Sequence, residues 1–341
     1  MLRLTTATTA LSLLATPGLA EAPRVVVDIA PVHALAARVM DGIAEPELLL
    51  EQDANPHAVQ LRPSQARMLS DADLVIWVGP ELSPWMESAL ESYGETAQII
   101  LMEHDATSLR DFTPPLDAED HEDGDHDHGA DHDHDADHDH GEEHGEHEAH
   151  DDHDDHDDHD DHGDAHAHGD KDPHVWLSVD NARAWVGAFA DDLAARDPEN
   201  AAAYRANADK ADAELAGLID RIEARLAPHR GSEIVTFHAA FGYFADRFDI
   251  EIAGSVRPGD ATTASAGAIA LLEEIVAEHG VECAFAEPAF DPGLLESIAG
   301  DTGLRIGTLD PTGALQTPGI GHYTATLYAL ADNLAACLED G

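Results

Sequence analysis

The segment "DLVIWVG" (73–79) contains an unbroken apolar run after Asp73, and it predicts the fold of the chain. Apolar residues at consecutive positions are typical of a strand that is buried on both faces, as strands of parallel sheets are. Similar runs lie on either side of it: "RVVVDIA" (24–30), "PELLLE" (46–51) and "AQIILM" (97–102). Short helices beginning at Pro63 and Pro84 are expected between them, because proline suits the first helical turn. Strands that alternate with helices predict an α/β protein.

The same pattern returns after residue 230. The apolar runs there are "EIVTFH" (233–238), "EIAGSV" (251–256), "CAFAE" (283–287) and "LRIGTLD" (304–310). The repetition predicts two similar α/β lobes with parallel-type sheets. The predicted boundaries are a signal peptide at 1–20, an N-terminal lobe at 21–197, a linker helix at 198–227 and a C-terminal lobe at 228–341.

A helical pattern lies between the two halves. Its apolar positions fall on one face at helical spacing: Leu215, Leu218, Ile219, Ile222 and Leu226. Asp197 is suited to the N-cap and Pro198 to the first helical position. We expect one long, rigid helix joining the lobes. The alternative is two helices broken near Gly217, because an interior glycine costs roughly 1 kcal/mol.

The first twenty residues, "MLRLTTATTALSLLATPGLA", have the three parts of a secretory signal peptide: an early cation, an apolar stretch and a small-residue site. The apolar stretch is too short to span a bilayer, which takes about 20 residues. We therefore expect cleavage near Ala20 and a mature periplasmic protein that is not embedded in the membrane.

The chain is strongly acidic, with a formal net charge of −53. This charge argues against a nucleic-acid partner, whose phosphates require a basic surface. A cation is the natural partner instead. Much of the charge lies in the low-complexity tract 117–172, which also holds 16 of the 24 histidines.

The tract has almost no apolar residues, so it is expected to be disordered without a ligand. Histidine-rich tracts of this composition are typical of metal binding, and imidazole with carboxylate suits zinc and other borderline divalent ions. A plain acidic linker is the alternative, but it does not explain so many histidines. The predicted auxiliary zinc-binding residues are His126, His128, His132, His134, His138, His140, His150, His153, His156, His159 and His162.

The chain contains two cysteines, Cys283 and Cys337. In an exported protein, two cysteines form a disulfide more often than they bind a metal. We therefore interpret them as a structural disulfide.

A small number of candidate ligands stand where ligands bind in open α/β sheets, outside the carboxyl ends of strands. His57 is in the loop after the second predicted strand, and His238 ends the strand "EIVTFH". His174 follows the tract directly, and Asp310 follows the last predicted strand. A tetrahedral zinc site needs three or four such groups. Their wide separation in sequence gives no compact motif.

Five segments in order resemble the cluster A-I substrate-binding proteins of metal ABC transporters, and the His/Asp tract between them resembles the zinc-uptake type. They are "PHAVQLRPSQARMLSDADLVIWVG", "DPHVWLS", "VTFHAAFGYFADRF", "FAEPAF" and "TLDP". The resemblance covers essentially the whole mature chain. It implies two α/β lobes joined by a rigid long helix, with the metal in the cleft between them. It also implies delivery to a membrane permease, and it supports a Cys283–Cys337 disulfide.

Carried over motif by motif, the resemblance implies that the zinc ligands are His57, His174 and His238. Manganese members of the family usually have a carboxylate in place of His238, and three imidazoles favour zinc over manganese. Some zinc members have an acid just before the first histidine, where this chain has Pro56. The fourth position therefore falls to Asp310, to water or to a histidine of the tract, and we favour Asp310 or water.

Glu287 ends a predicted strand and is a candidate for supporting a ligand imidazole through a hydrogen bond. His33 is expected to be structural. No role is predicted for His104, His229, His279 or His322.

The predicted function is high-affinity capture of Zn²⁺ in the periplasm and its delivery to an ABC permease, by a monomer without enzymatic activity. The tract would concentrate zinc beside the site. A secreted zinc hydrolase is the main competing hypothesis, since three histidines and an open position are also a catalytic pattern. Against it, the chain lacks "HExxH" and has no carboxylate beside His57 or His238. The pattern is also compatible with a carrier of manganese or another divalent metal, and with a metal buffer in which the tract is the functional part.

Overall fold

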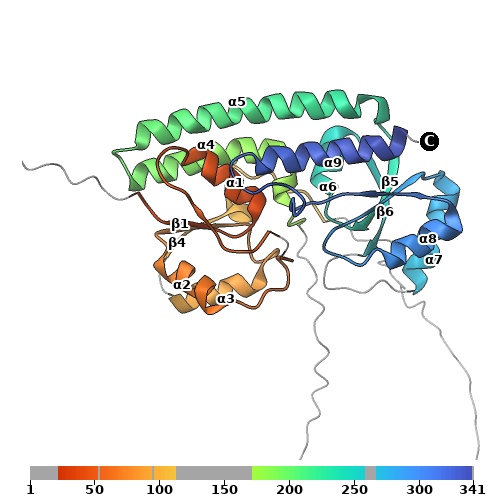
Figure 1. The fold of residues 1–341 in the computed structure, drawn as a ribbon, viewed down its shortest axis with the longest axis horizontal. Coiled ribbons are helices and arrows are strands. Elements are labelled where there is room, and N and C mark those ends of the chain that lie inside the picture. Colours follow the sequence, from red (N-terminus) through yellow and green to blue (C-terminus); the bar gives the residue numbers. More distant parts are fainter. Residues whose placement is uncertain (1–21, 53, 94–95, 113–170, 258–265, 340–341) are drawn as a thin grey trace, which may run out of the picture. The chain divides into compact units, whose positions relative to one another are not determined.

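The computed structural model describes residues 22–52, 54–93, 96–112, 171–257 and 266–339 (Figure 1). The predicted signal peptide and all the auxiliary histidines between positions 126 and 162 lie outside these residues. None of the described helices is both long enough and apolar enough to cross a membrane.

The N-terminal half contains a four-stranded parallel sheet in the order β2-β1-β3-β4. Its strands are β1 (Val25–Val27), β2 (Glu47–Leu48), β3 (Leu74–Trp77) and β4 (Ala97–Ile100). Each strand falls within one of the four predicted apolar runs. β3 is buried at every position, because it is paired on both edges and covered on both faces.

The C-terminal half contains a second four-stranded parallel sheet, in the order β6-β5-β7-β8. Its strands are β5 (Glu233–His238), β6 (Glu251–Arg257), β7 (Cys283–Ala286) and β8 (Arg305–Thr308). The predicted fold class, α/β with two similar parallel-sheet lobes, is confirmed.

Helices connect the strands and cover the sheets. The α-helices are α1 (Ala30–Val39), α2 (Pro63–Asp71), α3 (Pro84–Tyr93), α4 (Val179–Arg196), α5 (Ala201–Leu226), α6 (Gly242–Phe248), α7 (Ala266–His279), α8 (Gly293–Thr302) and α9 (His322–Glu339). Short 3₁₀ turns are η1 (Leu101–Glu103), η2 (Val175–Leu177) and η3 (Ala227–His229). The helices expected at Pro63 and Pro84 begin at those residues.

The helix between the halves is α5, and it runs through Gly217 without a break. The prediction of one helix is therefore confirmed, but its predicted start is wrong. Asp197 ends α4, and its carboxylate accepts hydrogen bonds from Asn200 N and from the Tyr204 hydroxyl. These bonds hold a turn between α4 and α5, so Asp197 does not cap α5, which begins at Ala201.

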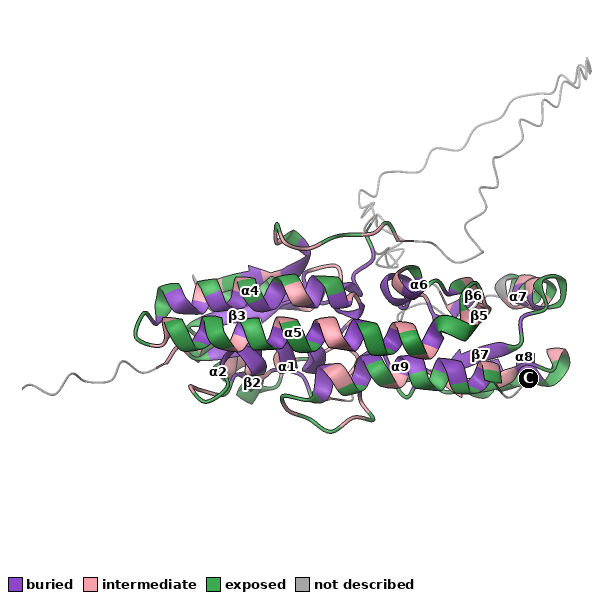
Figure 2. Cartoon of the chain, turned by 90° about the horizontal axis from the view of Figure 1, so that it is seen from above, coloured by how far each residue is buried: buried purple, intermediate pink, exposed green. Residues whose placement is uncertain are grey.

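Two helices contact elements of both halves. α5 packs against α4, α1, α9 and α6, and α9 packs against α1, α5 and β8. Figure 2 shows α4, α5 and α9 side by side, with buried residues repeating along each helix. One apolar cluster accordingly includes Leu35 of α1, Leu218 of α5, Phe285 of β7 and Leu330 of α9. The two halves share this core.

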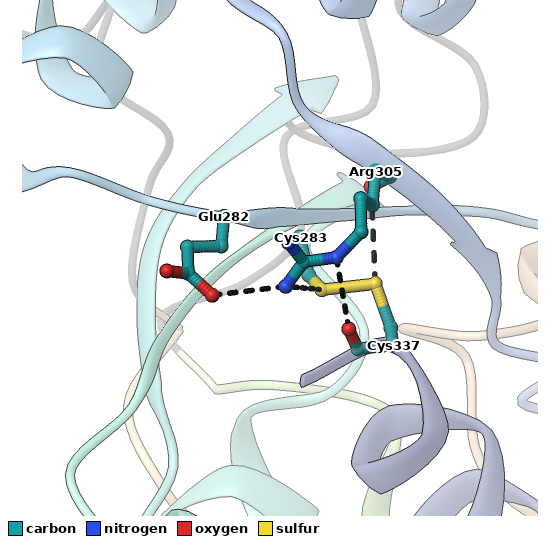
Figure 3. Close-up of a disulfide and its surroundings, with 4 residues drawn as sticks. All are labelled: Glu282, Cys283, Arg305 and Cys337. Carbon is teal, nitrogen blue, oxygen red and sulfur yellow. Dashed lines mark hydrogen bonds and ion pairs between the residues drawn. A yellow bond between two sulfur atoms is a disulfide. The ribbon is translucent and has the colours of Figure 1, made fainter. Parts of the chain in front are cut away.

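The predicted disulfide is present and joins Cys283 at the start of β7 to Cys337 near the end of α9, with 6.2 Å between their Cα atoms (Figure 3). Arg305 of β8 lies beside it, donating from Nε to the Cys337 carbonyl and from Nη2 to the Glu282 carboxylate. The disulfide thus fixes α9 to the C-terminal sheet.

Candidate metal centre

His238 is the last residue of β5 and is buried there. Its Nδ1 lies 2.6 Å from Oε1 of Glu287, the residue directly after β7. β5 and β7 are neighbours in the parallel sheet, so residues just beyond their carboxyl ends lie side by side. The suggestion that Glu287 supports a ligand imidazole therefore agrees with the geometry. This contact favours the His238 tautomer with its proton on Nδ1, which can donate to the carboxylate.

His174 has the same arrangement, made from a different part of the chain. Its backbone N–H and its Nδ1 both donate to Oδ1 of Asp172, at 3.0 and 2.8 Å. Oδ2 of Asp172 accepts from Nη1 of Arg110 at 3.0 Å. Burial of Asp172 opposes its ionisation, but the hydrogen bonds from His174 and Arg110 hold its pKa below the ordinary value. Asp172 therefore carries the charge that orients His174.

The two imidazoles converge on one point. Nε2 of His174 and Nε2 of His238 are 3.3 Å apart. In the neutral tautomer with its proton on Nδ1, each imidazole presents an Nε2 lone pair at this contact. On a tetrahedral zinc ion with Zn–N bonds of 2.0–2.1 Å, two ligand nitrogens are separated by roughly 3.3–3.4 Å. The pair is therefore spaced as two zinc ligands would be.

The electrostatics of His174 favour a neutral ring. Burial lowers the pKa of His174 below its ordinary value, and the neighbouring His238 and His57 lower it further, against the opposing effect of Asp172. A neutral imidazole at neutral pH keeps its Nε2 lone pair available to a cation.

His57 comes from the N-terminal half, in the loop between β2 and α2. Its ring centroid is 5.8 Å from that of His174, and its side chain is less buried than the other two. The loop is fixed at Pro56, whose carbonyl accepts from Ser83 Oγ and Trp85 Nε1. His57 N–H donates to Asn55 Oδ1. The backbone beside His57 is thus held, while its imidazole is the most accessible of the three.

Asp310 follows β8 and is buried, and both of its carboxylate oxygens accept backbone hydrogen bonds. Oδ1 accepts from Gly313 N and Oδ2 from Leu315 N, each at 2.8 Å. Each oxygen retains a further lone pair, so these bonds orient the carboxylate without using all of its acceptor capacity.

His57, His174, His238 and Asp310 line one open cavity. Its other walls are largely apolar, with the Trp176 ring 5.3 Å from His174 and the Phe290 ring 5.6 Å from His238. Such walls exclude water and strengthen electrostatic attraction to a cation. Within the described ranges, no group of three or more His, Cys, Asp or Glu side chains is arranged as a complete metal site. The structure therefore gives a spaced pair with two further candidates around it.

Several residues of this region carry no clear signal in the sequence. Asp172 and Arg110 flank the tract, and the "DPH" spacing of Asp172 and His174 is the one local signal that could have indicated their pairing. His322, for which no role is predicted, is buried at the start of α9, with Nε2 3.0 Å from the Gly313 carbonyl. His33 is structural as expected, since its Nε2 contacts the Pro46 carbonyl at 2.8 Å.

Each half is an α/β unit with a parallel sheet, and histidines from both halves line a single cavity. These features are typical of metal-binding solute-binding proteins. The sequence profile of the family described as "Zinc-uptake complex component A periplasmic" matches residues 25–337. The chain belongs to this family. It is a family of periplasmic metal-binding transport components rather than of enzymes.

Named relatives match this chain over nearly its full length. The high-affinity zinc uptake system protein ZnuA of Paracoccus denitrificans is 46% identical over 331 residues, with 96% of each chain covered. The protein of the same name from Brucella suis is 35% identical, with 92% of this chain and 91% of the relative covered.

Solved structures share the fold at lower sequence identity. A crystal structure of ZnuA has a TM-score of 0.67 at 21% identity, covering 93% of this chain and 99% of that one. The solute-binding protein FpvC of Pseudomonas aeruginosa, in complex with Mn²⁺, has a TM-score of 0.68 at 19% identity, covering 94% and 100%.

Proposed function

We propose that this protein captures Zn²⁺ in the periplasm with high affinity and delivers it to the permease of an ABC transporter. The observation that carries the proposal is the convergence of the His174 and His238 Nε2 atoms at 3.3 Å, each ring oriented by a buried carboxylate. Family membership and the names of the relatives support zinc as the transported ion.

In this proposal, the zinc ligands are His57, His174 and His238. His174 and His238 are already at ligand spacing, and His57 completes the set by turning its accessible ring toward them. Asp310 or water takes the fourth position. Three imidazoles favour zinc over manganese, which prefers oxygen ligands. The carboxylates of Asp172 and Glu287 raise the basicity of their imidazoles and fix the ring orientation.

The same geometry argues for a carrier rather than a hydrolase. A zinc hydrolase needs a general base that activates the metal-bound water. Asp172 and Glu287 instead face the Nδ1 side of the imidazoles, away from the Nε2 atoms that would hold the ion. Asp310 lines the cavity, but both of its oxygens accept backbone hydrogen bonds, and the proposal gives it a ligand position. Hydrolytic turnover by the zinc-loaded protein above the buffer rate would contradict the carrier proposal.

The predicted organisation of the chain belongs to the same proposal. It has a signal peptide cleaved near Ala20, lobes at 21–197 and 228–341, a rigid linker helix that is α5 (Ala201–Leu226) in the structure, and a monomeric mature form. The tract 117–172 serves as an auxiliary zinc-concentrating segment tethered to His174. Tethering keeps captured ions at high effective concentration beside the site.

Deleting residues 117–170 tests whether the tight zinc site lies in the cavity or in the tract. The deletion is expected to leave one tight zinc site with affinity within about threefold of the full chain, and to remove only weaker additional ions. The stoichiometry and affinity are measured by zinc titration against a chelator of known affinity. Loss of tight binding on deletion would contradict the proposal and assign the function to the tract.

Zinc affinity is expected to depend on pH in a particular direction. Protons compete with the metal for Nε2, and burial already lowers the pKa of His174 below its ordinary value. Affinity should therefore change little between pH 8 and pH 7 and fall steeply below about pH 6, by up to about tenfold per pH unit for each histidine that protonates. The same competition titration at four pH values measures this. A steep fall between pH 8 and pH 7 would contradict it.

A further inference from the structure

Gln52 connects the loop that carries His57 to the turn that follows Asp310. Its side-chain Nε2 donates to the Gly313 carbonyl and to the Gln316 carbonyl, each at 2.5 Å. A side-chain amide has two N–H groups, so these two bonds use its full donor capacity. Gln52 belongs to the N-terminal half, and both acceptors belong to the C-terminal half.

The turn that accepts hydrogen bonds from Gln52 also orients the Asp310 carboxylate. The N–H groups of Gly313 and Leu315 donate to the Asp310 carboxylate, while the carbonyls of Gly313 and Gln316 accept from Gln52. The turn at 313–316 is therefore bonded both to Gln52 and to Asp310, which lines the cavity. A change at Gln52 can shift Asp310 through this turn.

The turn has little freedom to adopt another shape. Gly313 has a φ of +74°, which L side chains rarely adopt. A Cβ at this position would overlap Thr326 Oγ1 and lie 2.6 Å from His322 Cε1. The turn is thus pressed against the first residues of α9, and His322 Nε2 also contacts the Gly313 carbonyl. The hydrogen bonds from Gln52 are therefore made to a turn of fixed shape.

We propose that Gln52 is a positioning residue of the metal site, which holds the His57 loop and the Asp310 turn together and thereby limits the rate at which bound zinc leaves. This inference rests on the proposed function. Zinc bound by groups from both loops leaves when the loops separate, and separation must break both Gln52 bonds. Gln52 does not touch the ion.

The test compares zinc release from the full-length protein and three variants. Gln52→Ala removes the side chain, and Gln52→Met keeps its length and approximate volume but has no N–H donor. Gln60→Ala is the matched control, an exposed glutamine three residues after His57 in the same loop. Zinc-loaded protein is mixed with excess chromogenic chelator in a stopped-flow instrument, and the melting temperature of each metal-free protein is measured alongside.

Losing two hydrogen bonds is expected to speed zinc release by roughly tenfold in both Gln52 variants. Gln60→Ala should release zinc at the wild-type rate, and the metal-free melting temperatures should stay close to wild type. Wild-type release from Gln52→Met would overturn the inference, because it would assign Gln52 a packing role. Wild-type release from Gln52→Ala would overturn it as well. If the wild-type protein has no tight zinc site, the proposed function itself fails, which is a distinguishable result.

Discussion

Replacing His238 by alanine is expected to weaken zinc binding by at least about 100-fold. Losing a partner that only orients a ligand typically costs 10- to 100-fold in metal affinity, and losing the ligand itself should cost more. A 100-fold loss corresponds to about 2.7 kcal/mol of binding free energy. His238→Ala removes one of the two Nε2 atoms that already stand at zinc spacing, and it leaves the buried Glu287 without its imidazole partner. Competition with a chelator of known affinity measures the loss.

The matched control for His238 is His279→Ala. His279 lies at the end of α7, where its half-exposed ring pairs with Glu233 far from the cavity lining. Its replacement should leave zinc affinity unchanged. If His238→Ala binds zinc as tightly as wild type, the cavity is not the high-affinity site.

Replacing Asp172 by alanine is expected to weaken both the fold and the site. Asp172 is completely buried and accepts from His174 N, His174 Nδ1 and Arg110 Nη1. Removing one partner of a buried ion pair costs about 3–5 kcal/mol, because the other charge is left without compensation. Arg110 is 23% exposed and can recover some hydration, so the lower end of that range is expected. Zinc affinity should fall by about 10- to 100-fold, because His174 loses its orientation.

Urea unfolding of the metal-free protein and zinc competition measure these two effects separately. Asp246→Ala is the control, since Asp246 bonds the same Arg110 but its side chain is 65% exposed. That change should cost at most about 1 kcal/mol and leave zinc affinity unchanged. Equal effects of the two substitutions would show that Asp172 acts only as one more partner for Arg110.

The strands and the helices that begin at Pro63 and Pro84 could be predicted from the sequence because their signals are local. Eight apolar runs correspond to the eight described strands, and Pro63 and Pro84 begin helices. The predicted start of α5 is wrong for a physical reason. Asp197 is as well suited to end one helix and hold a turn as to begin the next, and only its bonds to Asn200 and Tyr204 distinguish the two.

The candidate site could be predicted only in part. Motif and place in the fold identify His57, His174 and His238, and the structure brings all three to one cavity. Their supporting partners act across long distances in sequence. Arg110 reaches Asp172 over 62 residues, and Gln52 reaches Gly313 over 261. No spacing rule connects such pairs, because the pairing is made by the completed fold.

The packing of α9 has a consequence for a chain that stops before this helix. α9 is the last described helix, yet its leucines share one apolar cluster with α1, the first helix, and it contacts both α1 and α5. The core of the N-terminal half is therefore completed by residues of α9. A product that stops before α9 lacks the leucines that complete this shared core, so it is expected to be less stable than the full chain.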